Sequence, residues 1–470
     1  SAPVPGPSGD ARARFATAVP PPGGTRATGV LDLESSEGPG HLPDVHAARG
    51  SMPLRRAPPA PSEPAPGAVP GAAACEHAHR GYVQVPRSRA AEGMVLVETV
   101  RIGVAGLGAI AQVAYLPLLD RRRDLFRLAA VCDLDREHAE WFGHRFGVPA
   151  YDDPERMLDA GGCDALLVLT SGSHGALVRA ALERGLWVLS EAPLGYSRAE
   201  LSDLPDAARL MVGYMKQYDP AAQRLLECLH EAGGPEVIRH LCVTVLRPPG
   251  RTQLLFAKPR GSHPSPARLS RYADADERSI SAALGEEAPK PVRRLYAEVL
   301  LEGVCLELSL IRMFTGAPAS VDHVAVWPAE TYPPSVEASG ALPGAGRYGL
   351  HWHFLTGYPA YHQTVALHHE HGSFELSFRC PYLLNTPSRL LIRSRIGTTE
   401  RTLVFEDVAE AFERQLVAFH RFVTQDERPV SGLAEALTDI AVAQRMIRRY
   451  AEAAGEPVGG ECAALPAGGG

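Results

Sequence analysis

Short apolar runs alternate with amphipathic stretches along the first half of the chain. The apolar runs are rich in valine, leucine and isoleucine, as expected for strands that are buried on both faces. They cover 97–106, 127–133, 164–170, 186–192 and 209–214. Between them, the pattern predicts helices over 109–121, 136–146, 174–184 and 197–207. Strands that alternate with helices indicate an α/β fold, a doubly wound parallel sheet with helices on both faces.

The pattern changes after Pro220. A helix is predicted over 221–232, a long strand over 236–248, and a loop with one short helix over the polar, proline-containing stretch 248–290. A long helix over 292–314 precedes consecutive alternating strands near 320–327, 348–356, 361–369, 373–380 and 388–395. Helices over 408–425 and 432–452 follow, with apolar faces that predict packing against the first sheet. This part therefore predicts an α+β domain with an open, mainly antiparallel sheet.

The two ends of the chain lack such patterns. Residues 1–98 are rich in proline, glycine and alanine, and such a composition cannot bury enough apolar surface to offset chain entropy. We therefore predict a disordered segment over 1–98, a first domain over 99–218, a second domain over 219–455 and a flexible tail over 456–470. Met94 directly precedes the first strand, and one hypothesis is that the natural chain starts there. A peptide from residues 60–90 in the native protein would contradict this hypothesis.

Composition narrows the class of protein. Of 470 residues, 45% are hydrophobic and 21% are charged, and the formal net charge is −7. These values are ordinary for a globular protein, and they give no reason to expect a nucleic-acid partner. The eight cysteines form no CxxC pair, and no apolar stretch approaches the ~20 residues of a membrane span. We therefore expect a cytoplasmic protein with no disulfide framework and no membrane partner.

A glycine-rich turn follows the first predicted strand. Gly106, Gly108 and Ala111 match the pattern GxGxxA, and the intervening Ala109 and Ile110 begin the next helix. Gly106 permits the tight turn, Gly108 lets the backbone approach a pyrophosphate, and the helix N-terminus offers free N–H groups. This arrangement predicts a Rossmann dinucleotide site. The alternative is a glycine turn in a domain that binds no nucleotide.

Asp133 suggests which dinucleotide binds. It ends the second predicted strand, 25 residues after Gly108, where a carboxylate can hold a ribose hydroxyl. A carboxylate there would repel a 2′-phosphate, so the sequence favours NAD over NADP.

Several segments in order resemble the Gfo/Idh/MocA oxidoreductase family. They are GVAGLGAIAQVAYLPLL, VCDLD, SGSHGALVRAALERGLWVLSEAPLG, VGYMKQYDP, GYPAYHQTVAL, FRCPYLLNTPSRL and FERQLVAFHRFV, and they cover about 99–455. The resemblance implies NAD(P)-dependent oxidation or reduction of sugars, cyclitols or related alcohols. It also implies a second domain whose open sheet often serves oligomerisation, so we expect a homodimer or homotetramer. The resemblance further implies that five residues lie beside the cofactor: Thr170, Ser171, His174, Glu191 and Pro193.

The resemblance fails at the family's catalytic positions. The family's EKP motif reads Glu191-Ala192-Pro193 here, and alanine can neither donate nor accept a proton. Its Asp and His, four apart on a helix, correspond to Glu302 and Leu306. One carboxylate remains and two proton-handling groups are missing, although removing a hydroxyl proton requires a base.

Lys216 is a candidate replacement for the missing groups. The chain has only three lysines, and Lys216 follows the last strand of the first domain, where it should face the cleft between the domains. A partly desolvated lysine there could serve as a base, and Tyr214 or Tyr218 could relay a proton. In the alternative interpretation, Lys216 contacts a cofactor phosphate or a carboxylate and the tyrosines pack.

Two other groups of residues are candidate ligand sites. His351, His353, His362, His368, His369 and His371 resemble a metal cluster, but no carboxylate or cysteine falls in ligand spacing with them, so we predict no metal. The 248–290 segment contains Arg251, Lys258, Arg260 and Arg268, which could grip an anionic substrate such as a nucleotide sugar or simply form a solvated surface.

Three functions remain open from the sequence. The first is an NAD-dependent oxidoreductase of a small sugar-like or cyclitol-like substrate, in which Glu302 and Lys216 handle protons. The second is a degenerate family member that binds dinucleotide or sugar as a partner or sensor. The third is a lyase or epimerase that uses bound cofactor without net oxidation.

Overall fold

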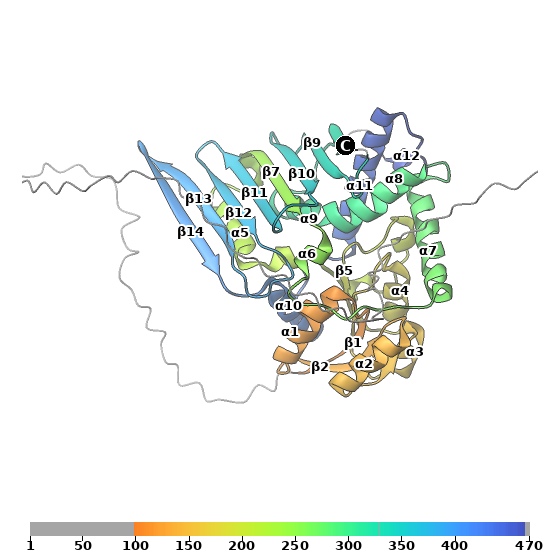
Figure 1. The fold of residues 1–470 in the computed structure, drawn as a ribbon. Helices are drawn as coiled ribbons and strands as arrows, with labels where there is room; N and C mark the ends of the chain where they lie inside the picture. The colour runs from red at the N-terminus through yellow and green to blue at the C-terminus, as the bar shows by residue number, and fades with distance from the viewer. Residues whose placement is uncertain (1–97, 329, 466–470) are drawn as a thin grey trace, which may run out of the picture. The chain divides into compact units, whose positions relative to one another are not determined.

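The computed structural model describes residues 98–328 and 330–465 (Figure 1). The predicted disordered segment lies outside these residues except for its last position, so it stays a prediction. Within the described ranges, no helix combines the length and the apolar character that a membrane crossing needs.

The first sheet consists of six parallel strands in the order β3-β2-β1-β4-β5-β6. The strands are β1 (Val100–Ala105), β2 (Phe126–Cys132), β3 (Ala150–Tyr151), β4 (Ala165–Val168), β5 (Trp187–Glu191) and β6 (Leu210–Gly213). This order is that of the Rossmann fold. The predicted parallel sheet is confirmed, because continuous apolar runs identify strands that are buried on both faces.

Short polar signals set the helices between these strands. Helix α2 (Arg136–Phe146) begins after Asp135, whose carboxylate accepts a hydrogen bond from the His138 backbone N–H, and it ends at Gly147 with φ +67°. Helices α3 (Pro154–Ala160) and α4 (Gly175–Glu183) follow β3 and β4. The first helical stretch begins with a π-helical segment over Ala111–Tyr115 and continues as α1 (Leu116–Arg121).

The helix predicted over 197–207 is wrong. The structure has only two short 3₁₀ turns here, Ala199–Leu201 and Ala207–Arg209. Pro205 interrupts the segment and cannot donate within a helix. The Ser197 hydroxyl accepts a hydrogen bond from the Glu200 backbone N–H, which is a local alternative to helical bonding.

The second sheet has eight strands in the order β14-β13-β12-β11-β7-β10-β9-β8. They are β7 (Ile238–Arg247), β8 (His323–Trp327), β9 (Ser335–Ala341), β10 (Arg347–Phe354), β11 (His362–His369), β12 (Gly372–Phe378), β13 (Ser388–Ile396) and β14 (Thr399–Asp407). Only the β7–β10 pair is parallel, so the predicted mainly antiparallel sheet is confirmed.

Two strands of this sheet were missed in the sequence. Strand β14 lies at the sheet edge and most of its residues are exposed, so it lacks a buried face with alternating polarity. Strand β9 reads SVEASGA, with small residues in place of the bulky ones that mark strands.

The predicted loop over 248–290 is also wrong in part. It contains α6 (Gly250–Gln253) and the 19-residue helix α7 (Pro266–Leu284). Only the last turns of α7 are buried, around Ile280 and Leu284, whereas Leu269 and Tyr272 near its start are exposed. A helix with so short a buried face gives little apolar periodicity.

The long helix predicted over 292–314 is present with an altered middle. It consists of α8 (Lys290–Arg294), a π-helical segment over Leu295–Val304, and α9 (Cys305–Thr315). Helix α5 (Pro220–Glu231) precedes β7 and was predicted from the sequence. In the π-helical segment the backbone bonds run five residues apart, as from Cys305 N to Leu300 O.

The last long helices pack against earlier parts of the chain. Helix α10 (Ala411–Gln425) packs Phe412, Leu416 and Phe419 into the core of the first sheet, as predicted, and lies beside α1 (Figure 1). Helix α11 (Leu433–Ala454) contacts α9 and β8.

The flexible tail predicted over 456–470 is wrong for residues 456–465. Helix α12 (Gly460–Ala464) buries Cys462 completely. The Glu461 carboxylate accepts hydrogen bonds from the backbone N–H groups of Arg198 and Ala199, at 2.9 and 2.6 Å. These contacts fix a segment whose glycine content suggested freedom.

Candidate functional site

The glycine turn after β1 has the shape of a phosphate cradle. Gly106 adopts φ +93°, and a Cβ there would lie 2.6 Å from the backbone of Leu169, so only glycine fits. A Cβ at Gly108 would meet nothing within 4 Å. The turn is therefore tight at Gly106 and open at Gly108, where Ala109 and Ile110 begin the helix.

Asp133 lies beside this turn. Its carboxylate accepts hydrogen bonds from the backbone N–H groups of Leu107 (3.1 Å) and Asp135 (3.0 Å). The Ser262 hydroxyl also donates to this carboxylate, at 2.6 Å. The Ser262 hydroxyl therefore already donates to the carboxylate oxygen to which a ribose hydroxyl would donate.

Ser262 belongs to a segment that crosses the turn, residues 258–265, which we call the strap. It joins α6 to α7 and bonds to the first helical turn after β1 and to residues directly after β2. The contacts join Arg260 to Gln112 through two hydrogen bonds, Ser262 to Asp133, and the His263 N–H to Asp135. The strap therefore covers the part of the turn where the sequence predicts the adenosine half of a dinucleotide.

The cations around the strap do not gather at the cavity described below. Arg268 pairs with Asp152 at 2.6 Å, and the Arg260 guanidinium lies 5.3 Å from the Trp141 ring centre. Among the residues that the structure describes, Arg251 and Lys258 are likewise absent from the cavity wall, which instead includes Arg247. The idea that this segment grips an anionic substrate in the cavity is not supported by these positions.

A cavity of about 220 Å³ lies at the carboxyl edge of the first sheet. Ile110, Thr170 and Glu191 line it from the nucleotide side. The opposite wall comes from the π-helical segment and from the second sheet, through residues that include Glu302, Leu306 and Trp352. Ala192 and Leu306, which the sequence resemblance aligns with the family's lysine and histidine, both line this space.

Glu191 is the first of two acidic groups in the wall. The Tyr115 hydroxyl donates a hydrogen bond to its carboxylate, and the Gln415 amide donates to Tyr115 at 2.8 Å. Burial raises the pKa of Glu191 to about 7, even though the Tyr115 hydroxyl favours the ionised form. This carboxyl therefore changes charge near neutral pH.

Glu302 is the second acidic group. The Tyr196 hydroxyl donates to its carboxylate at 2.7 Å. Glu302 lines the cavity and part of its side chain is exposed there, but the surrounding wall still removes much of the solvent from its carboxyl group. This desolvation raises the pKa of Glu302 above its ordinary value, and the Tyr196 hydroxyl only partly offsets it.

Lys216 also reaches the cavity, on the short turn after β6. Its ammonium donates to Glu307 at 3.2 Å, to Tyr361 at 3.1 Å and to the Gln363 side chain. Burial lowers the pKa of Lys216, but Glu307 and Tyr361 more than offset burial, so the pKa lies above its ordinary value. Lys216 therefore stays protonated, and its predicted role as a neutral base is not supported.

The other residues predicted for the site are not among those that line the cavity. The Tyr218 hydroxyl accepts a hydrogen bond from the Val430 N–H and lies outside the described cavity wall, as does Tyr214. The buried His174 ring bonds to the backbone oxygens of Thr170 (2.8 Å) and Glu191 (2.9 Å). His174 therefore clasps two cofactor-side loops together, while Pro193 is buried beside them and Ser171 is exposed.

Sequence reasoning missed the partners of Lys216. Glu307 is buried on α9, one residue past Leu306, and its carboxylate accepts a hydrogen bond from the Gln363 amide. A spacing of four from Glu302, as in an α-helix, points to Leu306 alone. The π-helical turn adds a residue to the spacing, and it brings both Leu306 and Glu307 to the wall.

Comparison with known proteins agrees with this geometry. Residues 100–212 match the family model described as "Oxidoreductase family, NAD-binding Rossmann fold". Inositol 2-dehydrogenase 4 of Saccharopolyspora erythraea is 31% identical over 166 residues, which are 33% of this chain and 49% of that protein. An inositol 2-dehydrogenase/D-chiro-inositol 3-dehydrogenase of Shouchella clausii is 32% identical over 152 residues, 30% of this chain and 44% of that protein. The chain thus spans about half the length of these relatives.

Solved structures resemble both sheets. An aldose-aldose oxidoreductase from Caulobacter crescentus, complexed with glycerol, aligns with a TM-score of 0.57 at 16% identity, over 76% of this chain and 98% of that chain. A 3-ketoreductase from Actinomadura kijaniata, in complex with TDP-benzene and NADP, aligns with a TM-score of 0.54 at 18% identity, over 74% and 96%. At these identities the likeness concerns the fold.

Proposed function

We propose that this chain, whose residues 100–212 match the family model of the Gfo/Idh/MocA oxidoreductases, is an NAD-dependent oxidoreductase of a sugar, nucleotide sugar or cyclitol-like alcohol. One observation carries the proposal. A single cavity joins the carboxyl edge of the nucleotide-binding sheet, at Ile110 and Thr170, to titratable groups at Glu302 and Lys216. Such a space can hold an alcohol between a cofactor and a proton acceptor.

The residues of the glycine turn fit a dinucleotide. The space over Gly108 admits a pyrophosphate, and the Asp133 carboxylate can hold the adenosine ribose through its hydroxyls. The family binds NAD(P), and we propose NAD because Asp133 would repel a 2′-phosphate. When bound, the nicotinamide supplies or accepts the hydride, while the side chains of this chain orient the substrate and move the proton.

The strap provides a first test of this assignment. Because Ser262 donates to the carboxylate that we assign to the ribose, it competes with NAD. A hydrogen bond to a charged group contributes ~1.5–3 kcal/mol, so Ser262→Ala should strengthen NAD binding by roughly 10- to 100-fold. Fluorescence titration with NADH measures the change. Ser270→Ala, an exposed serine of α7 that bonds to the Ala267 carbonyl, is the control, and an equal effect in both variants would contradict the assignment.

In the proposed reaction the two polar groups have different roles. Lys216 remains a cation in the cavity wall, and although its three N–H groups are donated to Glu307, Tyr361 and Gln363, its positive charge stabilises negative charge on the substrate oxygen. Glu302 accepts the hydroxyl proton during oxidation and returns it during reduction. Tyr196 holds the Glu302 carboxylate in place.

A second function is favoured by one observation. Ala192 and Leu306 place apolar groups in the cavity wall, where the family has its catalytic lysine and histidine. A chain without these groups can bind dinucleotide and a sugar-like ligand without turning the ligand over. In that case it acts as a binding protein or a sensor.

One experiment separates the two functions. The full chain is titrated with NADH and then assayed for turnover with inositol and with ketosugars. The oxidoreductase proposal predicts binding with measurable turnover, and binding without turnover on any of these compounds favours the second function.

The variant Ala192→Lys/Leu306→His provides an internal check. It should raise turnover by about tenfold, less than the ~10²–10⁴-fold of well-positioned groups, because its neighbours do not orient the new side chains. Ala192→Met/Leu306→Met is the control for size. If NADH binding is intact but neither turnover nor its increase is seen, the cavity does not bind a substrate of this class.

A further inference from the structure

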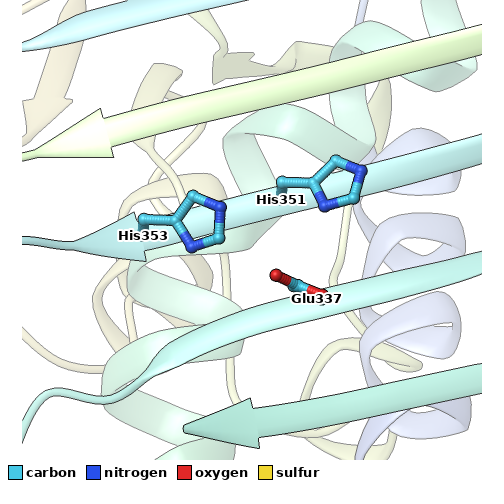
Figure 2. A group of neighbouring side chains, drawn as sticks. All are labelled: Glu337, His351 and His353. Carbon is cyan, nitrogen blue, oxygen red and sulfur yellow. The ribbon is translucent and has the colours of Figure 1, made fainter. Parts of the chain in front are cut away.

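The open face of the second sheet carries two histidines and a carboxylate that converge. His351 and His353 lie two residues apart on β10 and therefore share one face of the strand. Glu337 on β9 pairs directly with His351 in the antiparallel register. One ligand atom from each of the three residues lies within 4.8 Å of the others, and Figure 2 shows the carboxylate beside both rings.

These three side chains lack the bonds expected of such neighbours. Throughout the described ranges of the chain, no hydrogen bond or ion pair joins Glu337, His351 and His353 to one another. The Nδ1 atom of His353 is buried and has no hydrogen-bond partner. An unpaired buried nitrogen is costly, and a ligand that accepts its lone pair would remove that cost. The gap between the three groups is therefore one that a cation can fill.

The surroundings suit a bound ion. The Trp327 ring lies 5.4 Å from the His353 ring and forms an apolar wall. Gly349 lies on the same face of β10, and a Cβ there would approach His351 Nε2 to 3.2 Å, so the glycine leaves room beside that nitrogen.

We propose that Glu337, His351 and His353 bind a divalent transition-metal ion of the zinc type. Two imidazoles and one carboxylate are ligands that Zn²⁺ prefers, at ~2.0–2.2 Å from the metal. Small rotations of the three half-buried side chains close the present separations to this range. Three protein ligands leave a further position for water.

The sequence predicted no metal here because it showed no carboxylate in ligand spacing with the histidines. Glu337 is 14 residues before His351 and lies on β9, a strand that the sequence did not reveal. Pairing of β9 with β10 supplies the missing carboxylate.

The site lies on the strand that also forms the cavity wall. Trp352, between the two histidines, points to the opposite face of β10 and lines the cavity. Its ring packs closely on Gly303 of the π-helical segment, where a Cβ would lie 3.1 Å from the ring. An ion that joins β9 to β10 therefore stiffens the strand pair that positions Trp352.

Zinc titration of the chelator-treated full chain tests this site. We expect one Zn²⁺ per chain by calorimetry, a rise in melting temperature on binding, and visible absorption bands with Co²⁺ that report low-symmetry coordination. The variant His351→Gln/His353→Gln should lose stoichiometric binding, and Glu337→Gln should weaken it. His368→Gln is the matched control, because His368 is an exposed histidine of the same sheet that stacks on His240 and, among the described residues, has no third ligand beside it.

The variants also distinguish loss of metal binding from loss of folding. Each metal-free variant should melt at the temperature of the metal-free parent, because these three side chains make no hydrogen bond or ion pair with one another in the described structure. The proposal is overturned if the parent chain binds no Zn²⁺. It is also overturned if Zn²⁺ binds the parent and the His351→Gln/His353→Gln variant equally well, or if His368→Gln alone abolishes binding.

Discussion

Replacing Glu302 with glutamine lowers the rate of alcohol oxidation by ~10²–10⁴-fold, because the amide cannot accept the hydroxyl proton. NADH affinity should change little, since Glu302 lies on the substrate side of the cavity. The rate of the parent enzyme should rise with pH through the pKa of Glu302, which burial places above the ordinary value. Only the ionised carboxylate is a base, so raising the pKa moves this rise to higher pH. The kcat of both proteins is measured with NAD and a cyclitol over a range of pH.

Glu298→Gln is the matched control for this prediction. Glu298 lies four residues earlier in the same π-helical segment, is exposed, and pairs with Arg294 at 3.1 Å outside the described cavity wall. Its replacement should leave the maximal rate unchanged and move the rise of the pH profile only slightly to lower pH, because the Glu298 charge contributes less than burial to the raised pKa of Glu302. If Glu302→Gln keeps the parent's rate and pH profile, the base is another group, and Glu191 with a pKa of about 7 is the next candidate.

Replacing Lys216 with methionine lowers the free energy of unfolding by about 3–5 kcal/mol at alkaline pH, because it leaves the Glu307 carboxylate buried without its cation. Burial already raises the pKa of Glu307, and loss of Lys216 raises it further. A carboxyl whose folded pKa is raised stabilises the fold at low pH and loses that contribution as pH rises. The deficit of the variant should therefore be small near pH 5 and grow toward pH 9. Urea unfolding at several pH values measures it.

The double variant Lys216→Met/Glu307→Gln tests the cause. It removes both charges, so it should recover most of the stability and lose the pH dependence. Turnover should stay low in both variants if the charge of Lys216 stabilises the substrate oxygen. An equal loss of stability at pH 5 and pH 9 in Lys216→Met would contradict the ion-pair explanation.

Most of the first domain could be predicted from the sequence; the exceptions are β3 and α3, which were not predicted, and the helix over 197–207, which was wrong. The other strands are buried and appear as apolar runs, whereas β3 has only two half-buried residues, and helix α2 was predicted with its correct bounds because Asp135 and Gly147 mark its ends. The glycine turn was also predictable, because the requirement for φ +93° at Gly106 is a property of one residue type. These signals are local in the chain.

The catalytic neighbourhood was less predictable because its contacts are long-range. Lys216 was identified as a cavity residue, but its charge state depends on Glu307 and Tyr361, which lie 91 and 145 residues away. The π-helical turn over Leu295–Val304 adds Glu307 to the wall, and no sequence period announces it. Glu337 was missed for a similar reason, since strand β9 has small residues and no clear alternation of polarity.

The strap was missed because it is neither a helix nor a strand and is held in place by long-range hydrogen bonds, which leave no periodic pattern in the sequence. Its residues bond through backbone groups and through Ser262 to side chains 128–148 residues away. A sequence with prolines, arginines and serines here reads as a solvated loop. Only the fold shows that this loop covers the carboxylate assigned to the ribose.

Calorimetric titration with NAD and NADP tests the central claim, that a dinucleotide binds over the turn at Gly106–Ala111. We expect saturable heat with NAD, weaker binding of NADP, and no binding to Gly108→Val. That variant should fold, because the position has an ordinary φ and its Cβ meets nothing within 4 Å, but its side chain fills the phosphate space. No heat from either dinucleotide on the folded parent chain, or equal NAD binding by Gly108→Val, would contradict the claim.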